Sequence, residues 1–292
     1  MSLEKKFWQW VLLLFLAFIW GSSFILMKRG LEVFDNPQVA VLRILLASLL
    51  LLPIGLKNFW KVNKKNILPL LATAFFGNGI PAFLFTKAQT VLSSSFTGML
   101  NSLVPLFTLA LGVLFFKIKV TKINVAGVFI GLLGAVLLIA VQSNFNFGNP
   151  NVFYSFLVVL ATLCYAISVN VIKQYLHNMD SQSITGIAFT ILLPFMLIVF
   201  FSVFSWSDFQ VKGALKATGY IFILSFFGTA MAVLLFNELI KYTSSLFASS
   251  VTYLIPVVAI LWGVFDNEPI YGLSVVSIGV ILLGVYLVNK RN

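Results

Sequence analysis

Residues 93–114, SSSFTGMLNSLVPLFTLALGVL, decide the fold, because a related stretch, SSLFASSVTYLIPVVAILWGVF, returns at residues 244–265. The two stretches align without a gap and match Pro105 with Pro256 and Gly112 with Gly263. The same offset pairs Phe-Phe-Gly at 75–77 with Phe-Phe-Gly at 226–228. Each copy is an apolar run of about 20 residues, which as a helix crosses roughly 30 Å of hydrocarbon. A central proline is tolerated there because neighbouring helices can satisfy the carbonyl that it frees. The repeat therefore predicts a membrane bundle made of two related halves.

The composition is that of a polytopic membrane protein. Hydrophobic residues make up 60% of the 292 residues and charged residues only 9%, which is outside the range of soluble domains. With one cysteine, Cys164, and one histidine, we expect no internal disulfide, no metal site and no cofactor. The net charge of +11 comes from lysines in short loops, which indicates membrane topology and not nucleic acid binding. The apolar run at 7–27 is too long for a signal peptide and predicts a retained helix.

Ten apolar segments, separated by charged or turn-forming residues, predict ten membrane-spanning helices. We expect these helices at 8–27, 37–56, 67–87, 94–116, 122–141, 152–172, 182–204, 217–237, 245–265 and 270–288. The polar turn at 142–150 separates an N-terminal five-helix repeat, 1–145, from a C-terminal five-helix repeat, 146–292. The expected fold class is an all-α membrane protein with ten transmembrane helices in two repeats.

An odd number of spans in each repeat requires the halves to enter the membrane from opposite sides, as an inverted repeat. If the N-terminus is cytoplasmic, thirteen of the 19 basic residues lie in inner segments, five in outer segments and Arg43 within a span. The positive-inside rule then predicts that both termini are cytoplasmic. The duplicated loops agree, because residues 116–121 are basic whereas residues 266–268 are acidic.

The chain resembles the EamA type of the drug/metabolite transporter superfamily. The resemblance rests on the ten spans in two halves, WGSSF at 20–24, an arginine within VLRILLASLLLLP at 41–53, and the block from the third to the fifth helix that occurs in both halves. It covers nearly the whole chain and implies an inner-membrane transporter of small metabolites such as amino acids, often an exporter, with a central cavity between the halves. Members commonly carry a glutamate after the fourth and ninth helices. Glu268 matches the second position, but the first reads Lys-Ile-Lys at 117–119.

Polar side chains at mid-membrane depth are the candidates for substrate binding, because they cost free energy unless they have a partner or face water. Arg43, about two turns inside its helix, would attract a carboxylate. Between the two halves, Asn78 corresponds to Thr229, Asn101 to Thr252 and Ser102 to Tyr253. Asn101 and Thr252 each lie four residues before a proline, which leaves their carbonyl groups without a helical N–H donor. Trp20 and Tyr165 correspond between the first helices of the halves. The expected substrate-binding set is Trp20, Ser23, Arg43, Asn78, Asn101, Tyr165, Thr252 and Tyr253.

Each candidate also has a purely structural interpretation. Arg43 would serve equally as a snorkelling or carbonyl-capping residue. The amides and hydroxyls would serve as interhelical hydrogen bonds worth about 0.6 kcal/mol each, and the aromatic side chains as packing. Gly127, Gly131 and Gly134 predict close helix contact, either within one chain or across a homodimer. The expected partners are a small-molecule substrate and the lipid bilayer, for a monomer or a homodimer.

The remaining function classes are an intramembrane enzyme and a channel. An enzyme needs a nucleophile with a base, and no histidine or aspartate lies within reach of a serine in the predicted spans. A channel usually takes its symmetry from identical subunits, whereas here one chain contains the repeat. No acidic residue lies deep in a predicted span, so we expect exchange or uniport and not proton coupling. The sequence thus predicts a non-enzymatic transporter that works by alternating access.

Overall fold

The computed structural model describes residues 5–116, 121–144, 146, 148–244, 247–248 and 250–289, and every regular element in these ranges is helical. The first half contains α1 (Lys6–Leu31), α2 (Asn36–Asn58), α3 (Ile67–Ala74), η2 (Phe75–Gly79), α4 (Ile80–Gln89), α5 (Ser94–Leu100), η3 (Asn101–Leu103), α6 (Val104–Phe116) and α7 (Lys122–Gln142). The second half contains α8 (Pro150–Tyr175), α9 (Ser181–Val203), α10 (Ala214–Ser225), η5 (Phe226–Met231), α11 (Ala232–Tyr242), η6 (Ser250–Tyr253), α13 (Ile255–Phe265) and α14 (Gly272–Asn289). Short turns of 3₁₀ helix, η1 (Phe59–Lys61) and η4 (Trp206–Gln210), follow α2 and α9.

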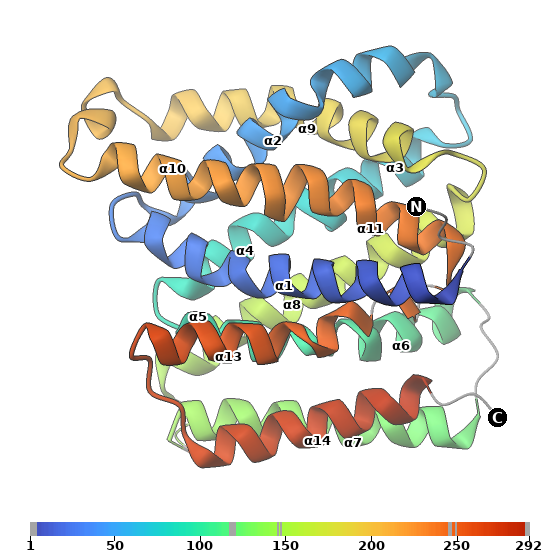
Figure 1. Ribbon diagram of the computed structural model, residues 1–292, viewed down its shortest axis with the longest axis vertical. Helices are drawn as coiled ribbons and strands as arrows, with labels where there is room; N and C mark the ends of the chain where they lie inside the picture. The colour runs from blue at the N-terminus through green and yellow to red at the C-terminus, as the bar shows by residue number, and fades with distance from the viewer. Residues whose placement is uncertain are drawn as a thin grey trace.

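Eight helical segments of the described chain are long and apolar enough to cross a bilayer, and two shorter apolar segments, Val251–Phe265 and Gly272–Val288, complete the chain. The prediction of an all-helical membrane protein is confirmed at this level. The helices run side by side, and the first turn of α1 and the last turn of α14 lie at the same end of the bundle (Figure 1). In the same view α7 and α14 form one outer layer, while α2 and α9 pack together on the opposite side of the molecule.

The local sequence explains where several helices begin. The α2 helix starts with Pro37 in its first turn, and Gln38 Oε1 accepts a hydrogen bond from the Asp35 N–H at 2.9 Å. The α8 helix starts at Pro150, and the Asn149 side chain caps it by accepting from the Asn151 N–H at 2.9 Å. Proline in the first turn and a polar residue just before it are favoured helix starts, because the first N–H groups have no partner inside the helix.

Two kinds of interruption recur in both halves. The Phe-Phe-Gly motifs form π-helical turns, η2 and η5, which the sequence analysis did not predict. The prolines behave differently from the prediction, because the turn before each of them tightens into 3₁₀ helix, η3 and η6. The Asn101 carbonyl that Pro105 leaves without its α-helical donor therefore accepts from the Val104 N–H instead.

The glycines of α7 pack against α14 of the same chain. A Cβ atom on Gly127 would lie 2.6 Å from the Gly284 carbonyl oxygen, and one on Gly284 would lie 2.4 Å from the Gly131 nitrogen. This confirms that these glycines pack within one chain. Gly98 of α5 similarly contacts Ala259 of α13, where an added Cβ would lie at 2.4 Å. The Lys-Ile-Lys segment at 117–119 lies outside the described residues.

The first helix is longer than the sequence predicted. It runs from Lys6 to Leu31 and so carries Lys28 and Arg29 in its last turn, whereas residues 8–27 were expected. These two cations extend the helix beyond the apolar run because they reach acidic residues of the loop between α13 and α14.

Candidate functional site

A cavity of about 100 Å³, measured as the space open to the centres of water molecules, lies inside the bundle. Its walls come from α1, α2, the α3–η2–α4 segment, α8 and the η5–α11 segment, with contributions from η3, α6 and η6. Seven of the eight residues predicted to bind substrate line this cavity: Trp20, Ser23, Arg43, Asn78, Asn101, Tyr165 and Thr252. Tyr253 does not, because its hydroxyl donates to the Val285 carbonyl oxygen of α14 at 3.1 Å.

Arg43 brings a cation into this cavity. Its side chain is buried, with 8% exposure, and its Nε donates to Thr229 Oγ1 at 3.0 Å. The Tyr165 side chain interacts with the same guanidinium. None of the ion pairs of the described residues includes Arg43. The guanidinium therefore lies at the cavity without a paired carboxylate from the described part of the chain.

The two π-helical turns carry matching polar side chains to the cavity. The Asn78 Nδ2 donates to the Thr73 carbonyl oxygen at 3.2 Å, five residues earlier. The Thr229 hydroxyl donates to the Leu224 carbonyl oxygen at 3.3 Å, again five residues earlier. A π-helical turn inserts one extra residue into the helix and so redirects the side chains beside it, and such turns are frequent at functional sites.

The glycine of each π-helical turn touches the first helix of the other half. A Cβ atom on Gly77 would lie 2.4 Å from Ser168 Oγ of α8, and one on Gly228 would lie 2.6 Å from Ser23 Oγ of α1. The indole Nε1 of Trp20 also donates to the Gly228 carbonyl oxygen at 3.0 Å. At each of these two glycine crossings, η2 with α8 and η5 with α1, the missing side chain lets the two helices approach closely at the wall of the cavity.

Asn101 supplies an unsatisfied acceptor. Its side chain is buried, and among the described residues its Oδ1 has no hydrogen-bond partner. A buried polar atom of this kind costs about 1–3 kcal/mol when it stays unpaired. Asn101 lines the cavity, but its Oδ1 atom is itself shielded, so a ligand that donates a hydrogen bond would remove this cost only after the side-chain amide turns.

Aromatic side chains form the apolar part of the walls. Trp20 packs edge-to-face on Phe236 with ring centroids 4.9 Å apart, and Phe85 stacks on Tyr165 at 5.8 Å. The sequence analysis did not single out Phe85 or Phe236. No sequence signal separates them from the other aromatic residues, because these make up 15% of the chain.

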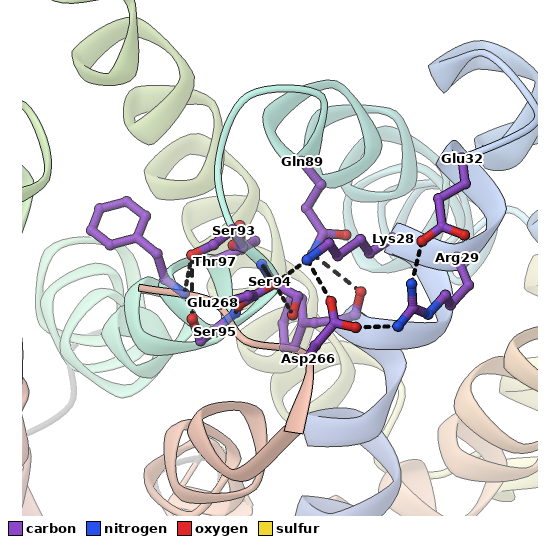
Figure 2. Close-up of polar contacts among 12 residues, drawn as sticks. Lys28, Arg29, Glu32, Gln89, Ser93, Ser94, Ser95, Thr97, Asp266 and Glu268 are labelled. Carbon is purple, nitrogen blue, oxygen red and sulfur yellow. Dashed lines mark hydrogen bonds and ion pairs between the residues drawn. The ribbon is translucent and has the colours of Figure 1, made fainter. Parts of the chain in front are cut away.

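A cluster of charged residues and serines lies at one end of the bundle, as Figure 2 shows, and is here called the Glu268 cluster: Lys28, Arg29, Ser94, Ser95, Asp266 and Glu268. Lys28 Nζ lies 2.6 Å from Asp266 Oδ2 and 2.8 Å from Glu268 Oε1. Arg29 pairs with Asp266, and with Glu32 beside the cluster. The cluster joins the end of α1 to the loop between α13 and α14.

The Glu268 carboxylate also binds the start of α5. It accepts hydrogen bonds from the Ser94 N–H at 3.0 Å, the Ser94 hydroxyl at 2.8 Å and the Ser95 N–H at 2.9 Å. Its side chain is only 3% exposed. Burial opposes its ionisation, but the hydrogen bonds from Lys28 and from the two serines outweigh that effect and lower the pKa of Glu268 to about 2.

The opposite end of the bundle has a looser contact between the halves. Lys61 Nζ lies 2.7 Å from Asp180 Oδ2 and 2.8 Å from Ser183 Oγ. The Lys61 and Asp180 side chains are 29% and 43% exposed. Burial alone would raise the pKa of Asp180, but the hydrogen bonds from Lys61 and Ser183 lower it below its ordinary value. Exposed pairs of this kind contribute about 0–1 kcal/mol, so this end is held more weakly than the end with the Glu268 cluster.

Comparisons with known proteins agree with this architecture. The model of the EamA-like transporter family matches residues 8–140 and again residues 152–290. The chain is 25% identical to an uncharacterized transporter of Archaeoglobus fulgidus, over 97% of this chain and 99% of that protein. It is 28% identical to the uncharacterized inner membrane transporter YedA of Escherichia coli, over 94% of this chain and 88% of YedA. A solved crystal structure superposes with a TM-score of 0.67 over 95% of each chain, at 15% identity, and so shows the similarity of the fold. Because the two family matches together cover almost all of its sequence, this protein belongs to the EamA-like transporter family and is a multi-pass membrane transporter.

Proposed function

We propose that this transporter carries a small metabolite with both a carboxylate and an amino group, such as an amino acid, across the inner membrane. The substrate binds in the central cavity and crosses by alternating access, in export or facilitated exchange. Trp20, Ser23, Arg43, Asn78, Asn101, Tyr165 and Thr252 form the binding site. Tyr253 is not included, because it bonds to α14 away from the cavity.

The observation that carries this proposal is the Arg43 guanidinium in the cavity. An arginine inside a membrane span costs about 2.5–3.5 kcal/mol near the centre on insertion scales. Here it has a hydroxyl partner, Thr229, but no carboxylate among the described residues. A substrate carboxylate would provide the missing charge, and arginine binds carboxylates in a two-pronged geometry.

The second polar group suits the other end of an amino acid. Asn101 Oδ1 lacks a donor among the described residues, and a rotation of this amide would present it to an ammonium group, which supplies up to three N–H donors. The aromatic walls around Trp20 and Phe85 accommodate an apolar side chain. The combination favours neutral amino acids over dicarboxylates, since the cavity lining contains a single cation, Arg43.

The proposed framework has ten spans in two inverted repeats, 1–145 and 146–292. Three observations support it. The family model matches the chain twice in succession, the π-helical turns at η2 and η5 lie 151 residues apart, and the crossing of Gly77 with Ser168 has a counterpart in the crossing of Gly228 with Ser23. Five passes of the chain precede α8, so α8 runs opposite to α1 in this arrangement, as inverted repeats require.

Both termini are proposed to be cytoplasmic, which makes the Glu268 cluster the outer barrier. The excess of lysines and arginines in the inner segments supports this orientation. Two of the outer cations, Lys28 and Arg29, are paired with Asp266. Because the carboxylates of the Glu268 cluster, Asp266 and Glu268, are more buried than that of Asp180, the conformation fits a transporter whose outer side is closed.

The proposed mechanism does not use proton coupling. The residues that line the cavity include no aspartate, glutamate or histidine among the described part of the chain. A proton-coupled carrier generally needs a protonatable group on the path of the substrate. The free energy for transport would then come from the gradient of the substrate or of an exchanged solute.

The test is counterflow in proteoliposomes with radiolabelled neutral L-amino acids, using the wild-type chain, Arg43→Ala, Arg43→Lys and Asn101→Ala. We expect uptake by the wild type, competition by amino acids but not by their carboxyl amides, and loss of this discrimination in Arg43→Ala. Arg43→Lys keeps the charge and should retain part of the activity. Thermal unfolding of each variant in detergent controls for folding.

Two results would contradict the proposal. Equal competition by amino acids and their amides in the wild type would remove the carboxylate from recognition. Uptake that acidifies or alkalises the vesicle lumen in proportion to flux would establish proton coupling, which a pH-sensitive dye inside the vesicles measures directly.

A further inference from the structure

The Thr229 hydroxyl has two defined hydrogen bonds, one on each side. It donates to the Leu224 carbonyl oxygen at 3.3 Å and therefore presents its lone pairs to Arg43, whose Nε donates to it at 3.0 Å. Both residues are buried, with exposures of 2% for Thr229 and 8% for Arg43. The direction of the hydrogen bond is fixed, because arginine has donors and no acceptor.

This hydrogen bond occupies Nε, so a carboxylate that binds Arg43 in a bidentate way would have to use the two terminal nitrogens and not Nε with one of them. A guanidinium has a fixed planar set of five donors, and its two terminal nitrogens form a fork that matches a carboxylate. With Nε held by Thr229, the rotation of the guanidinium about its long side chain is restricted. The Tyr165 side chain also interacts with the guanidinium, and Arg43 lines the cavity, so we expect a ligand there to meet the terminal nitrogens.

The π-helical turn is what brings the hydroxyl to this place. Threonine in a helix commonly bonds to the carbonyl four residues earlier, whereas Thr229 bonds to the carbonyl five residues earlier within η5. Arg43 belongs to α2 of the first half and Thr229 to η5 of the second half. The contact therefore crosses between the halves that move relative to each other in alternating access.

We infer that Thr229 is a positioning residue, which orients the Arg43 guanidinium so that its terminal nitrogens bind the substrate carboxylate. This inference rests on the proposed function, because it takes Arg43 as the carboxylate-binding group. Thr229 acts through Arg43 and not by contacting the carboxylate itself. Its loss should therefore weaken substrate binding without slowing the conformational change to the same degree.

The test uses Thr229→Val, which keeps the shape and removes the hydroxyl, and Thr229→Ser, which keeps the hydroxyl. The chain contains three arginines, Arg29, Arg43 and Arg291, so nuclear magnetic resonance of protein labelled with ¹⁵N-arginine shows few Nε–H signals, and Arg43→Lys assigns one of them. We expect hydrogen exchange at the Arg43 Nε–H to be about tenfold faster in Thr229→Val and close to the wild-type rate in Thr229→Ser.

The transport measurement uses L-leucine as substrate and L-leucinamide as competitor. In Thr229→Val we expect the KM for leucine to rise about tenfold with Vmax within about twofold, while the weak binding of leucinamide stays unchanged. Thr229→Ser should restore the KM. A generally misfolded variant would instead lose Vmax and affect both compounds.

Each outcome separates the two claims. Unchanged exchange at Arg43 in Thr229→Val overturns the positioning role, whatever transport shows. Faster exchange with an unchanged KM means that the hydrogen bond exists but does not orient Arg43 for substrate, which also overturns the inference. If Arg43→Ala retains full discrimination against leucinamide, the proposed function fails, and the exchange measurement still reports whether Thr229 holds Arg43.

Discussion

Replacing Glu268 with glutamine should open the end of the bundle that the Glu268 cluster closes. The carboxylate accepts hydrogen bonds from Lys28 and from the first N–H groups of α5. It comes from the loop between α13 and α14, whereas Lys28 and α5 belong to the first half. Glu268→Gln removes the charge and replaces one acceptor oxygen with a donor, while the size of the side chain stays almost the same.

The expected size of the effect follows from the pKa. Relative to the ordinary value of 4.5 for a glutamate, a pKa of about 2 for Glu268 corresponds to about 3 kcal/mol of interaction that favours the charged form, at 1.36 kcal/mol for each pH unit. Asp266 remains beside Lys28 in the variant, and the amide oxygen of glutamine still accepts a hydrogen bond. We therefore expect a net loss of about 1–2 kcal/mol, which changes the ratio of closed to open molecules by about 5–30-fold.

Cysteine labelling measures this ratio. Met27 precedes Lys28 on α1, lines the cavity and is only 1% exposed. On a Cys164→Ala background, Met27→Cys should react with a polar maleimide in detergent about 5–30-fold faster when Glu268→Gln is present. The matched control is Glu32→Gln, because Glu32 pairs with Arg29 but its side chain is 49% exposed. Exposed pairs one helical turn apart contribute only about 0.3–0.5 kcal/mol, so this control should change the labelling by less than about threefold.

Equal labelling rates in Glu268→Gln and Glu32→Gln would show that the cluster does not hold this end closed. A faster rate accompanied by a much lower unfolding temperature would point to general loosening of the bundle, which is also contrary to the prediction. Hydrogen exchange in the second half of α2, where Gly55 contacts Gly186 of α9, separates local opening from loosening and should stay unchanged.

Three further predictions concern backbone contacts and pH. Gly77→Ala places a methyl group 2.4 Å from Ser168 Oγ, so it should lower the free energy of unfolding by about 1–3 kcal/mol. Adding Ser168→Gly should restore most of the lost unfolding temperature, which scanning fluorimetry measures. Gly284→Ala should be more damaging because its methyl group meets backbone at 2.4 Å, whereas Gly279→Ala, with nothing within 4 Å, should be neutral or slightly stabilising in the same assay. The pKa of Glu268 is lowered to about 2, so its contribution to closing the bundle should be fully present above pH 4.5 and should be lost as the pH falls from 4.5 to 2. Distances between spin labels on α1 and on the α13–α14 loop would measure this opening.

The sequence was sufficient to predict the helical segments and seven of the residues that line the cavity. The duplicated stretches put Asn78, Asn101 and Thr252 at equivalent depths, and the structure brings all three to one cavity. The neighbours Thr252 and Tyr253 both lie in the 3₁₀ turn η6, where successive side chains point about 120° apart, so Tyr253 cannot share the direction of Thr252. It therefore points toward α14 while Thr252 faces the cavity.

The tertiary partners of the charged residues were beyond the reach of sequence reasoning. Lys28 and Glu268 are 240 residues apart, and Arg43 and Thr229 are 186 residues apart. Neither pair belongs to a periodic pattern, since each depends on how the two halves dock. The π-helical turns were also missed, because hydrophobic periodicity detects the spacing of apolar side chains and not one inserted residue inside an apolar segment.

The two halves share their π-helical turns and glycine contacts but differ in the charged residues at the cavity, and this asymmetry would determine how a substrate lies. The π-helical turns, their glycine contacts and the paired polar residues Asn78 and Thr229 occur in both halves. Arg43 has no second cation opposite it in the cavity. A symmetric site would accept a substrate in two orientations related by the repeat, whereas a single guanidinium fixes the carboxylate near α2. If the halves rock about the glycine crossings, the charged end of the substrate stays beside α2 and η5 throughout. The Arg43–Thr229 hydrogen bond would then couple substrate binding to the relative movement of the halves.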